Sequence, residues 1–318
     1  MPRLICIYNP KSNDGRALAL WQALIARPEA RDWQCDVLEL GREDLDAGLA
    51  RRLLAAPAAA AVVGVGGDGT HLSVINALKR CEAAHAGGEL PPYALVPAGT
   101  GNDLGKSFGL EPGTRGLPRV ARTILGGRLA ACDLGRWRGG YFADALCIGL
   151  DAAVLHERDR LQRATPPNRP WRRGYALYLL AAAKTGVAPP TWQAEVTVDG
   201  APWYRGPLVN LVVNNTAVHG GEFEVTPGAR WDDGQLDLAL FRSLPEYLWW
   251  YVHGWRHQPA WIKERARARD IVPPVPCRQI AVTLDRPAPV QTDGEGAGAA
   301  ARCEITVAPR ALRLRLPV

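Results

Sequence analysis

The stretch Val62-Val63-Gly64-Val65-Gly66-Gly67-Asp68-Gly69-Thr70 decides the fold of this 318-residue chain. An apolar run of strand character ends in glycines and then opens a helix at about residue 70. Glycines let backbone N–H groups approach an anion without interference from a Cβ atom, and the N-terminus of a helix adds a partial positive charge. The stretch therefore predicts a phosphate-binding turn between a buried strand and a helix.

Short apolar runs alternate with helical segments around this turn. Strands are expected at residues 4–8, 35–40, 60–65 and 93–96, and helices at residues 16–25, 44–54 and 70–79. Such alternation predicts an α/β domain with parallel strands and helices on both faces of the sheet. After Gly126-Gly127 strand-like runs follow one another, with helical segments only near residues 171–184 and 245–261. This change predicts a second, antiparallel β domain.

The chain is long enough for two hydrophobic cores, so we expect two domains. The first contains residues 1–127 and the second residues 128–310. The strand expected at residues 311–318 can return to the first domain.

Two further polar turns that carry glycine follow other predicted strands. Pro97-Ala98-Gly99-Thr100-Gly101-Asn102-Asp103 follows the strand at residues 93–96, and Asn9-Pro10-Lys11-Ser12-Asn13-Asp14-Gly15 follows the strand at residues 4–8. Ligands of open α/β sheets bind outside the carboxyl ends of the strands. We therefore expect the three turns to form one phosphate cradle.

The glycines at 64, 66 and 69 also fit the G-x-G-x-x-G pattern of dinucleotide-binding proteins. That pattern requires an acidic residue at the end of the next strand, which here ends at Val96-Pro97 without one. A dehydrogenase is therefore disfavoured.

The composition is that of an ordinary folded protein. Apolar residues make up 47% and charged residues 22%, and the formal charge of +6 permits attraction to phosphates or anionic lipid without identifying a partner. The seven cysteines have no C-x-x-C spacing, which favours reduced thiols over disulfides or a zinc site. We find no signal-peptide pattern and no apolar run of membrane-spanning length, so we expect a cytoplasmic protein.

Six motifs, in order along the chain, resemble the catalytic-domain family of diacylglycerol kinases, which includes bacterial lipid kinases and sphingosine kinases. They are Asn9-Pro10-Lys11-Ser12-Asn13, Gly66-Gly67-Asp68-Gly69-Thr70, Pro97-Ala98-Gly99-Thr100-Gly101-Asn102-Asp103, Gly149-Leu150-Asp151-Ala152, the segment 227–237 with Asp232-Asp233-Gly234, and Val290-Gln291-Thr292-Asp293-Gly294-Glu295. Such a set is far more specific than any one motif.

The resemblance implies a fold and a reaction. The first domain would bind ATP, and the second would be a β-sandwich that receives the lipid. With ATP and Mg²⁺ as cofactors, the chain would phosphorylate a hydroxyl of diacylglycerol or a related lipid alcohol, a sphingoid base or ceramide. The active site would lie in the cleft between the domains.

The resemblance also assigns roles to residues. Glu295 would accept the proton of the lipid hydroxyl, Asp293 would lie beside it, and Asp68 and Asp133 would join a network of acids, water and Mg²⁺. A further Mg²⁺ would be held by Asp233 with the backbone carbonyls of Arg230 and Gln235. The nucleotide would contact Asn9, Pro10, Lys11, Ser12, Asn13, Gly66, Gly67, Asp68, Gly69, Thr70, Gly99, Thr100, Gly101, Asn102 and Asp103.

Three residues depart from the family pattern. Asn13 replaces a glycine, which a turn tolerates because asparagine adopts positive φ more readily than most residues. Asp144 stands where many members have asparagine, and Glu222 follows Gly220-Gly221 in place of a third glycine. Both acids bear on the pocket for the lipid.

The segment from Trp249 to Arg269 leaves two interpretations open. Trp249, Trp250, Tyr251, Trp255 and Trp261 form an aromatic group, and Lys263, Arg265, Arg267 and Arg269 a basic one. Together with Trp171-Arg172-Arg173 they suit peripheral contact with the anionic inner face of a membrane. The same pattern is typical of a buried helix beside a solvated basic strand. No nucleic-acid motif accompanies it, so we expect no nucleic-acid partner.

Two rival functions remain. NAD kinases share the Gly-Gly-Asp-Gly-Thr turn and a β-rich second domain, but the motifs at residues 97–103 and 290–295 argue against that activity. A non-catalytic, nucleotide-sensing regulator would keep the fold, although the intact acids Asp68, Asp293 and Glu295 argue for catalysis.

Overall fold

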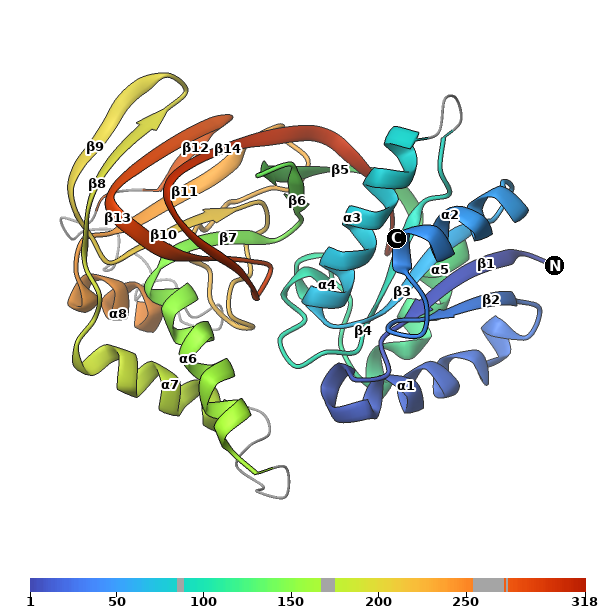
Figure 1. The fold of residues 1–318 in the computed structure, drawn as a ribbon. Helices are drawn as coiled ribbons and strands as arrows, with labels where there is room; N and C mark the ends of the chain where they lie inside the picture. The colour runs from blue at the N-terminus through green and yellow to red at the C-terminus, as the bar shows by residue number, and fades with distance from the viewer. Residues whose placement is uncertain (85–88, 167–174, 254–271, 273) are drawn as a thin grey trace. The chain divides into compact units, whose positions relative to one another are not determined.

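The computed structural model describes residues 1–84, 89–166, 175–253, 272 and 274–318 (Figure 1). These residues form two compact units: Met1–Cys132 with Arg310–Val318, and Asp133–Pro309. The division lies close to Gly127, the boundary expected from the sequence. Two strands, β5 (Arg128–Trp137) and β14 (Glu295–Leu316), begin in one unit and end in the other.

The first unit is built on a parallel sheet with the strand order β4-β3-β1-β2. The end of β14 joins this sheet in parallel beside β4, with Leu314 opposite Tyr93. The other elements are β1 (Arg3–Tyr8), η1 (Ser12–Gly15), α1 (Arg16–Ile25), η2 (Pro28–Ala30), β2 (Gln34–Glu39), α2 (Leu45–Ala55), β3 (Ala61–Gly66), α3 (Asp68–Ala84), β4 (Tyr93–Pro97), α4 (Asp103–Ser107), η3 (Thr114–Gly116) and α5 (Leu117–Gly126).

The chain reverses its direction across this sheet between β1 and β3. From β1 the chain passes through α1 to β2, which lies toward one edge of the sheet. From β3 it passes through α3 to β4, which lies toward the opposite edge. Figure 1 accordingly shows α1 on one face of the sheet and α2 and α3 on the opposite face. Every residue of β3 is buried, as a central parallel strand covered on both faces requires. The predicted α/β domain is confirmed.

Side chains explain where the helices of this unit begin and end. Asp44 caps α2 by accepting a hydrogen bond of 2.8 Å from the backbone N–H of Ala47. The sequence predicts that α3 ends near residue 79, but it continues to Ala84 because Cys81 extends the buried stripe of Val74 and Leu78 by another turn.

The second unit is antiparallel throughout its paired strands. Its ladder runs β12-β11-β10-β7-β13-β14, and β8 pairs with β13, β9 with β8, and β6 with β5. The elements are β6 (Gly140–Phe142), β7 (Ala145–Gly149), α6 (Leu150–Ala164), α7 (Tyr175–Val187), β8 (Trp192–Val198), β9 (Ala201–Leu208), β10 (Asn210–Asn214), β11 (Leu236–Phe241), α8 (Leu244–His253), β12 (Val275–Cys277) and β13 (Gln279–Thr292).

One long strand, β13, links two parts of this unit. Its residues 280–284 pair with β8 and its residues 290–292 with β7, with shifts of register on either side of Pro289. The predicted antiparallel β-sandwich is confirmed in class. Its strands are longer than expected, because the sequence around Pro287 and Pro289 reads as a break, whereas the structure accommodates it as a bulge.

Three helices cover the strands β7, β10 and β11. Leu150 and Val154 of α6, Ala181 of α7, and Trp250 of α8 are buried in one apolar cluster with these strands. Helix α6 is absent from the sequence-based expectation, which assigned no element to residues 150–164. Among the described residues, no helix combines the length and the apolar character that crossing a bilayer requires.

Candidate functional site

The three glycine-bearing turns of the first unit meet at the carboxyl ends of β1, β3 and β4. The backbone N–H of Asn9 donates to the carbonyl of Val65 at 3.1 Å, and the Asn9 side chain donates to Thr70 Oγ1 at 3.0 Å. The N–H of Ala98 donates to the carbonyl of Gly66 at 2.7 Å. These bonds join each turn to its neighbour at the point where the chain reverses direction across the sheet, which is where open α/β sheets bind ligands.

Glycine is required where the second and third turns touch. A Cβ atom on Gly99 would lie only 2.4 Å from the Cα of Gly67, and one on Gly67 would lie 3.0 Å from the Cα of Gly99. Ser12, from the first turn, donates to the carbonyl of Ala98 at 3.4 Å. The sequence attributes these glycines to contact with a ligand, but the structure adds a second reason: the turns themselves must approach closely.

The third turn is closed by Asn102. Its side chain accepts from the N–H of Gly99 at 2.7 Å and donates to the carbonyl of Gly99 at 2.8 Å, with a backbone φ of 57°. Thr100, Gly101 and Asp103 lie on the same turn, where a Cβ on Gly101 would be 3.2 Å from an Asp68 carboxylate oxygen. Asp68 and the third turn are therefore in direct contact.

Asp68 occupies the first turn of α3 and joins it to α4. One of its oxygens accepts from the backbone N–H of Leu104 at 3.2 Å. Burial raises the pKa of Asp68, while backbone N–H donors around residues 102–104 oppose that rise. A half-buried carboxylate among N–H groups is suited to orient a cation or a water molecule next to a phosphate.

The first turn needs positive φ at its tip. Asn13, which replaces the family glycine, has a φ of 50°, Asp14 a φ of 53° and Gly15 a φ of 85°. Asparagine and aspartate tolerate this conformation, so the turn keeps its shape. Lys11 is exposed, and its backbone N–H donates to Asn9 Oδ1 at 3.0 Å.

In the second unit, Asp293 acts on the backbone of a distant segment. Its carboxylate accepts three N–H groups, from Ala143 at 2.8 Å, Asp144 at 2.9 Å and Ala145 at 3.0 Å, and only 4% of Asp293 is exposed. A buried carboxylate with three backbone donors fixes the segment between β6 and β7. The sequence placed Asp293 beside the catalytic base, and the structure adds this clamping contact.

Glu295 follows two residues later, at the first position of β14, and is exposed. The turn before it is closed by the Gly294 N–H, which donates to Gln291 Oε1 at 2.7 Å, and Glu295 pairs with Thr292 across the turn. The Asp-Gly-Glu motif thus divides its two acids between a buried and an exposed position.

Asp133 organises the turn predicted to hold Mg²⁺. Its carboxylate accepts from the N–H of Gly234 at 2.6 Å, and it is 1% exposed. Asp233 accepts from the N–H of Gln235 at 3.0 Å, and the Arg230 guanidinium donates to Asp232 at 3.2 Å.

The donors around this turn fit a hard cation. Burial and the charge of Asp233 raise the pKa of Asp237 to about 6. The carboxyl groups of Asp233 and Asp237 therefore lie close enough to disfavour each other's charge, and carboxylate oxygens are ligands that Mg²⁺ prefers.

A buried polar cluster surrounds Asp151 at the start of α6. Its carboxylate accepts from Asn210 at 2.7 Å and from the hydroxyl of Tyr247, and lies 3.4 Å from His219 Nε2. Burial tends to raise the pKa of Asp151, but its bonds to His219, Tyr247 and Asn210 outweigh burial and hold the pKa below its usual value. The cluster ties α6 and α8 to β10.

Cys147 adds a thiol to this cluster. Its sulfur and the donor atoms of Asp151 and His219 all lie within 4.8 Å of one another, and burial raises the pKa of the thiol. A thiol and an imidazole are poor ligands for Mg²⁺. The hydrogen bonds already made by Asp151 and by Cys147, which accepts from Gln291 at 2.9 Å, explain the cluster as a structural network.

The residues that depart from the family pattern have defined places. Asp144 is buried and accepts a hydrogen bond from the hydroxyl of Thr216. Glu222 is half-buried in the turn between His219 and Phe223.

Sequence reasoning missed Asn215, whose amide donates to the carbonyls of Asp133 and Ala143 at 2.8 Å each. Buried asparagines inside the apolar run Val209–Val213 and just after it were the available signal.

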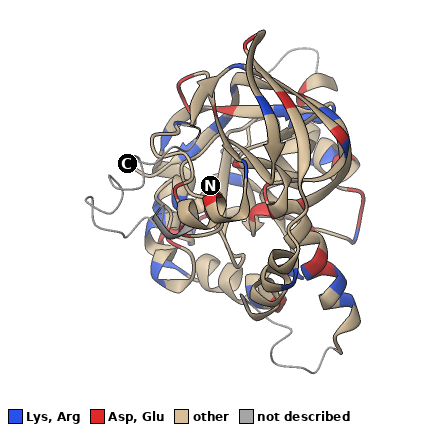
Figure 2. Cartoon of the chain, turned by 90° about the vertical axis from the view of Figure 1, so that its left-hand side faces the viewer, with Lys and Arg blue, Asp and Glu red and all other residues tan. Residues whose placement is uncertain are grey.

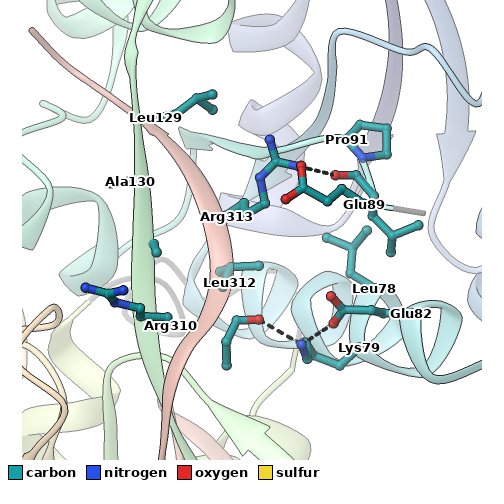
Figure 3. Close-up of a pocket in the computed structure, with 13 residues that line it drawn as sticks. Leu78, Lys79, Glu82, Glu89, Pro91, Leu129, Ala130, Arg310, Leu312 and Arg313 are labelled. Atoms are coloured by element: carbon teal, nitrogen blue, oxygen red, sulfur yellow. Dashed lines mark hydrogen bonds and ion pairs between the residues drawn. The ribbon is translucent and has the colours of Figure 1, made fainter. Parts of the chain in front are cut away.

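One hollow of the first unit lies away from the glycine turns. A pocket of about 470 Å³ lies beside the start of β4 and includes Lys79, Glu89 and Arg313 (Figure 3). Arg313 pairs with Glu89 at 2.6 Å, and Lys79 donates to the carbonyl of Ala311 at 2.8 Å. The pocket contains none of the predicted site residues, so its volume does not locate the site.

The chain thus combines a doubly wound α/β sheet, whose three turns are joined at one edge, with an antiparallel β-sandwich. The diacylglycerol kinase catalytic domain matches residues 3–137, and the YegS C-terminal NAD kinase beta sandwich-like domain matches residues 145–316. The chain therefore belongs to the diacylglycerol kinase/YegS-like family of lipid kinases, and membership in a kinase family implies the use of ATP.

Individual relatives agree with this family. A diacylglycerol kinase of Mycobacterium tuberculosis is 30% identical over 251 residues, which cover 76% of this chain and 74% of that protein. A YegS-like lipid kinase of Pseudomonas fluorescens is 28% identical over 229 residues, 71% of this chain and 69% of that protein. The crystal structure of a diacylglycerol kinase from Bacillus anthracis shares the fold with a TM-score of 0.68, at 19% identity over 99% of this chain and 96% of that one.

Proposed function

We propose that this chain transfers the γ-phosphoryl group of ATP to a hydroxyl of a membrane lipid, namely diacylglycerol or a related lipid alcohol, a sphingoid base or ceramide. The observation that carries the proposal is the junction of three turns at the reversal point of the first sheet. There the bonds Asn9–Thr70, Ala98–Gly66 and Leu104–Asp68 bring backbone N–H groups and one carboxylate together.

The first unit supplies the nucleotide side of the reaction. In the turns at residues 66–70 and 99–103, the backbone N–H groups that are not already bonded within the turns, as that of Gly99 is to Asn102, bind phosphate oxygens, helped by the N-terminus of the 17-residue helix α3. Asn9, Pro10, Lys11, Ser12 and Asn13 close over the same phosphates, with Lys11 adding a positive charge. Asp68 orients the cation that accompanies the triphosphate.

The second unit supplies the acceptor side. Glu295 is the exposed carboxylate that takes the proton from the lipid hydroxyl as the hydroxyl attacks the γ-phosphorus. Asp293 is a positioning residue, because its carboxylate is occupied by three backbone N–H groups. Bound Mg²⁺ supplies charge neutralisation on the phosphates. Asp233, with the carbonyls of Arg230 and Gln235, would hold a second ion that stiffens the turn gripped by Asp133.

In the test, purified protein is incubated with labelled ATP and a panel of acceptors: diacylglycerol, sphingosine, ceramide, an isoprenoid alcohol and NAD. Labelled lipid is the expected product, identified by its mass. The variant Glu295→Ala is run in parallel, so that label from a contaminating kinase is recognised. Label on NAD alone would replace the proposal with an NAD kinase, and ATP binding without turnover on any acceptor would replace it with a nucleotide-sensing regulator.

A further inference from the structure

Helix α7 carries apolar side chains on both faces. Leu177 and Ala181 are 2% and 0% exposed, and Ala181 packs in the apolar cluster that α7 shares with α6 and α8. On the opposite face, Leu179 is 63%, Leu180 43% and Val187 87% exposed. A helix that covers a core normally presents polar residues to water, so this outward apolar stripe is a candidate contact surface.

The stripe is continuous along the helix. Exposed apolar residues recur along it at helical spacing: Ala176, Leu179 and Leu180, Ala183, and Val187. Helix α8 lies beside the end of α7, because a Cβ on Gly186 would lie 4.0 Å from Leu244, and Leu248, one turn further along α8, is also exposed, at 51%. Figure 1 shows α7 and α8 as neighbours on the same side of the strands.

Cations border this stripe where α7 meets α6. A hollow of about 400 Å³ is lined by His156, Glu157 and Arg160 of α6 and by Lys184 of α7. Glu157 accepts from Arg160 at 2.7 Å and from Lys184 at 3.0 Å, so two cations share one carboxylate and leave a positive excess. Arg160 and Lys184 remain 56% and 52% exposed, and Figure 2 shows basic and acidic residues together along this end of the molecule.

We propose that the outer face of α7, extended by Leu248, docks this chain on an anionic phospholipid bilayer, with Arg160 and Lys184 against headgroup phosphates. The inference rests on the proposed function to this extent: its substrate resides in a bilayer that the enzyme must reach. Apolar side chains flanked by cations are the pattern of a helix that lies in the interface without spanning it.

A bilayer fits the stripe better than a second copy of the chain. A helix of 13 residues is about 20 Å long, so its exposed face offers on the order of 200 Å². A stable protein interface needs about 800 Å² from each partner, with matched shape. A lipid surface is fluid and accepts a narrow apolar stripe.

This surface differs from the one expected from the sequence. Trp250 is 7% exposed and packs in the core, so it is unavailable to lipid. Trp255, Trp261, Lys263, Arg265, Arg267, Arg269 and Trp171-Arg172-Arg173 lie outside the described residues. The proposed docking surface therefore lies on α7, whose exposed leucines were not among the residues predicted from the sequence to contact a membrane.

Vesicle co-sedimentation of the full chain tests the proposal, using phosphatidylcholine vesicles with and without phosphatidylglycerol. The variant Leu179→Gln/Leu180→Gln should reduce binding to the anionic vesicles roughly tenfold, which corresponds to about 1.4 kcal/mol of lost apolar burial. The matched control is Leu18→Gln/Leu54→Gln, whose leucines are similarly exposed, at 39% and 67%, on α1 and α2. It should bind as the unaltered chain does.

Three outcomes would overturn the proposal: equal loss in the control, unchanged binding of the Leu179/Leu180 variant, or a dimer of the unaltered chain that this variant dissociates in light scattering. If the double variant fails to fold, Lys184→Glu serves instead, since it keeps the stripe and should weaken binding only to anionic vesicles. Unchanged binding of Lys184→Glu would also overturn the proposal.

Phosphorylation of a water-soluble, short-chain diacylglycerol separates docking from catalysis. The Leu179/Leu180 variant should retain this activity within about twofold, because none of the proposed site residues lies on α7. Binding is measured without ATP, so a selective loss of vesicle binding supports docking even where no lipid accepts phosphate, an outcome that would refute only the proposed function.

Discussion

The glycine turns of the first unit and the Asp-Gly-Glu turn of the second present chemistry in opposite ways. In the first unit the proposed phosphate-binding groups are backbone N–H groups, and the side chains of Asn9, Thr70 and Asn102 hold the turns in place. In the second unit the proposed proton acceptor is the side chain of Glu295, and the backbone of residues 143–145 holds its neighbour Asp293.

The contrast teaches that the two kinds of site respond differently to substitution. A backbone site fails when a turn changes shape, so any added atom at a close approach is harmful. A side-chain site fails when one carboxylate is removed, while the fold persists. Five substitutions, from the largest expected effect to the smallest, can break or sharpen this distinction.

Glu295→Ala should lower kcat by about 10²–10⁴, the usual contribution of a general base, and leave ATP affinity unchanged. Glu295 is exposed, so its removal should not alter the melting temperature. The control is Glu304→Ala, another exposed glutamate on β14, which should behave as the unaltered chain. Near-normal turnover of Glu295→Ala would show that the proton goes elsewhere.

Asp293→Ala should destabilise the second unit by about 3 kcal/mol, since three buried N–H groups lose their acceptor. Thermal unfolding of the full chain measures this loss. The effect should be absent in Glu295→Ala, two residues away. An unchanged melting temperature in Asp293→Ala would contradict the clamp.

Gly99→Ala should weaken binding of an ATP analogue about tenfold, because the new Cβ would sit 2.4 Å from the Cα of Gly67 and push the two turns apart. Calorimetric titration measures the affinity. Gly126→Ala is the matched control: no atom lies within 4 Å of a Cβ built there. Equal affinity of the two variants would argue that the turns can separate without loss of binding.

Asp68→Asn should change the thermal stability of the chain in a pH-dependent way and should also abolish turnover, so the two effects can be measured separately. Burial raises the pKa of Asp68, so the folded chain loses stability as pH rises from about 4, where the unfolded carboxyl titrates, through the higher pKa of the folded group. The variant should therefore melt a few degrees higher than the unaltered chain near pH 8, with no gain at about pH 3, and should lose turnover.

Asp46→Asn should change the melting temperature in the opposite direction from Asp68→Asn. The hydrogen-bonded Arg80 lowers the pKa of Asp46, so its charge stabilises the fold above about pH 4. Removing that charge should lower the melting temperature slightly at neutral pH. A fall of the melting temperature in Asp68→Asn near pH 8 would contradict the burial argument.

The first unit was predictable from the sequence because its information is local. Each strand runs directly into its turn, and the parallel order brings the turns of β1, β3 and β4 to one edge. What was missing is the contact between Gly67 and Gly99, which depends on the distance between strands and not on either motif.

The second unit was less predictable because its contacts are distant in sequence. Asp293 binds residues about 150 positions earlier, and no local pattern announces such a bond. Helix α6 was missed because its buried face is confined to the first turns, at Leu150–Leu155, after which charged residues dominate. The exposed stripe of α7 was hidden because Leu177 and Leu179 look alike until burial distinguishes them.

The end of β14 has a consequence for how the chain is made. Strand β4 is buried along its whole length, and the strand that covers its outer side comes from residues 310–316, which leave the ribosome long after β4. Until then the nucleotide-binding half has an open, apolar edge that invites pairing with other chains. Folding of this half is thus completed only when a late segment of the chain returns to it.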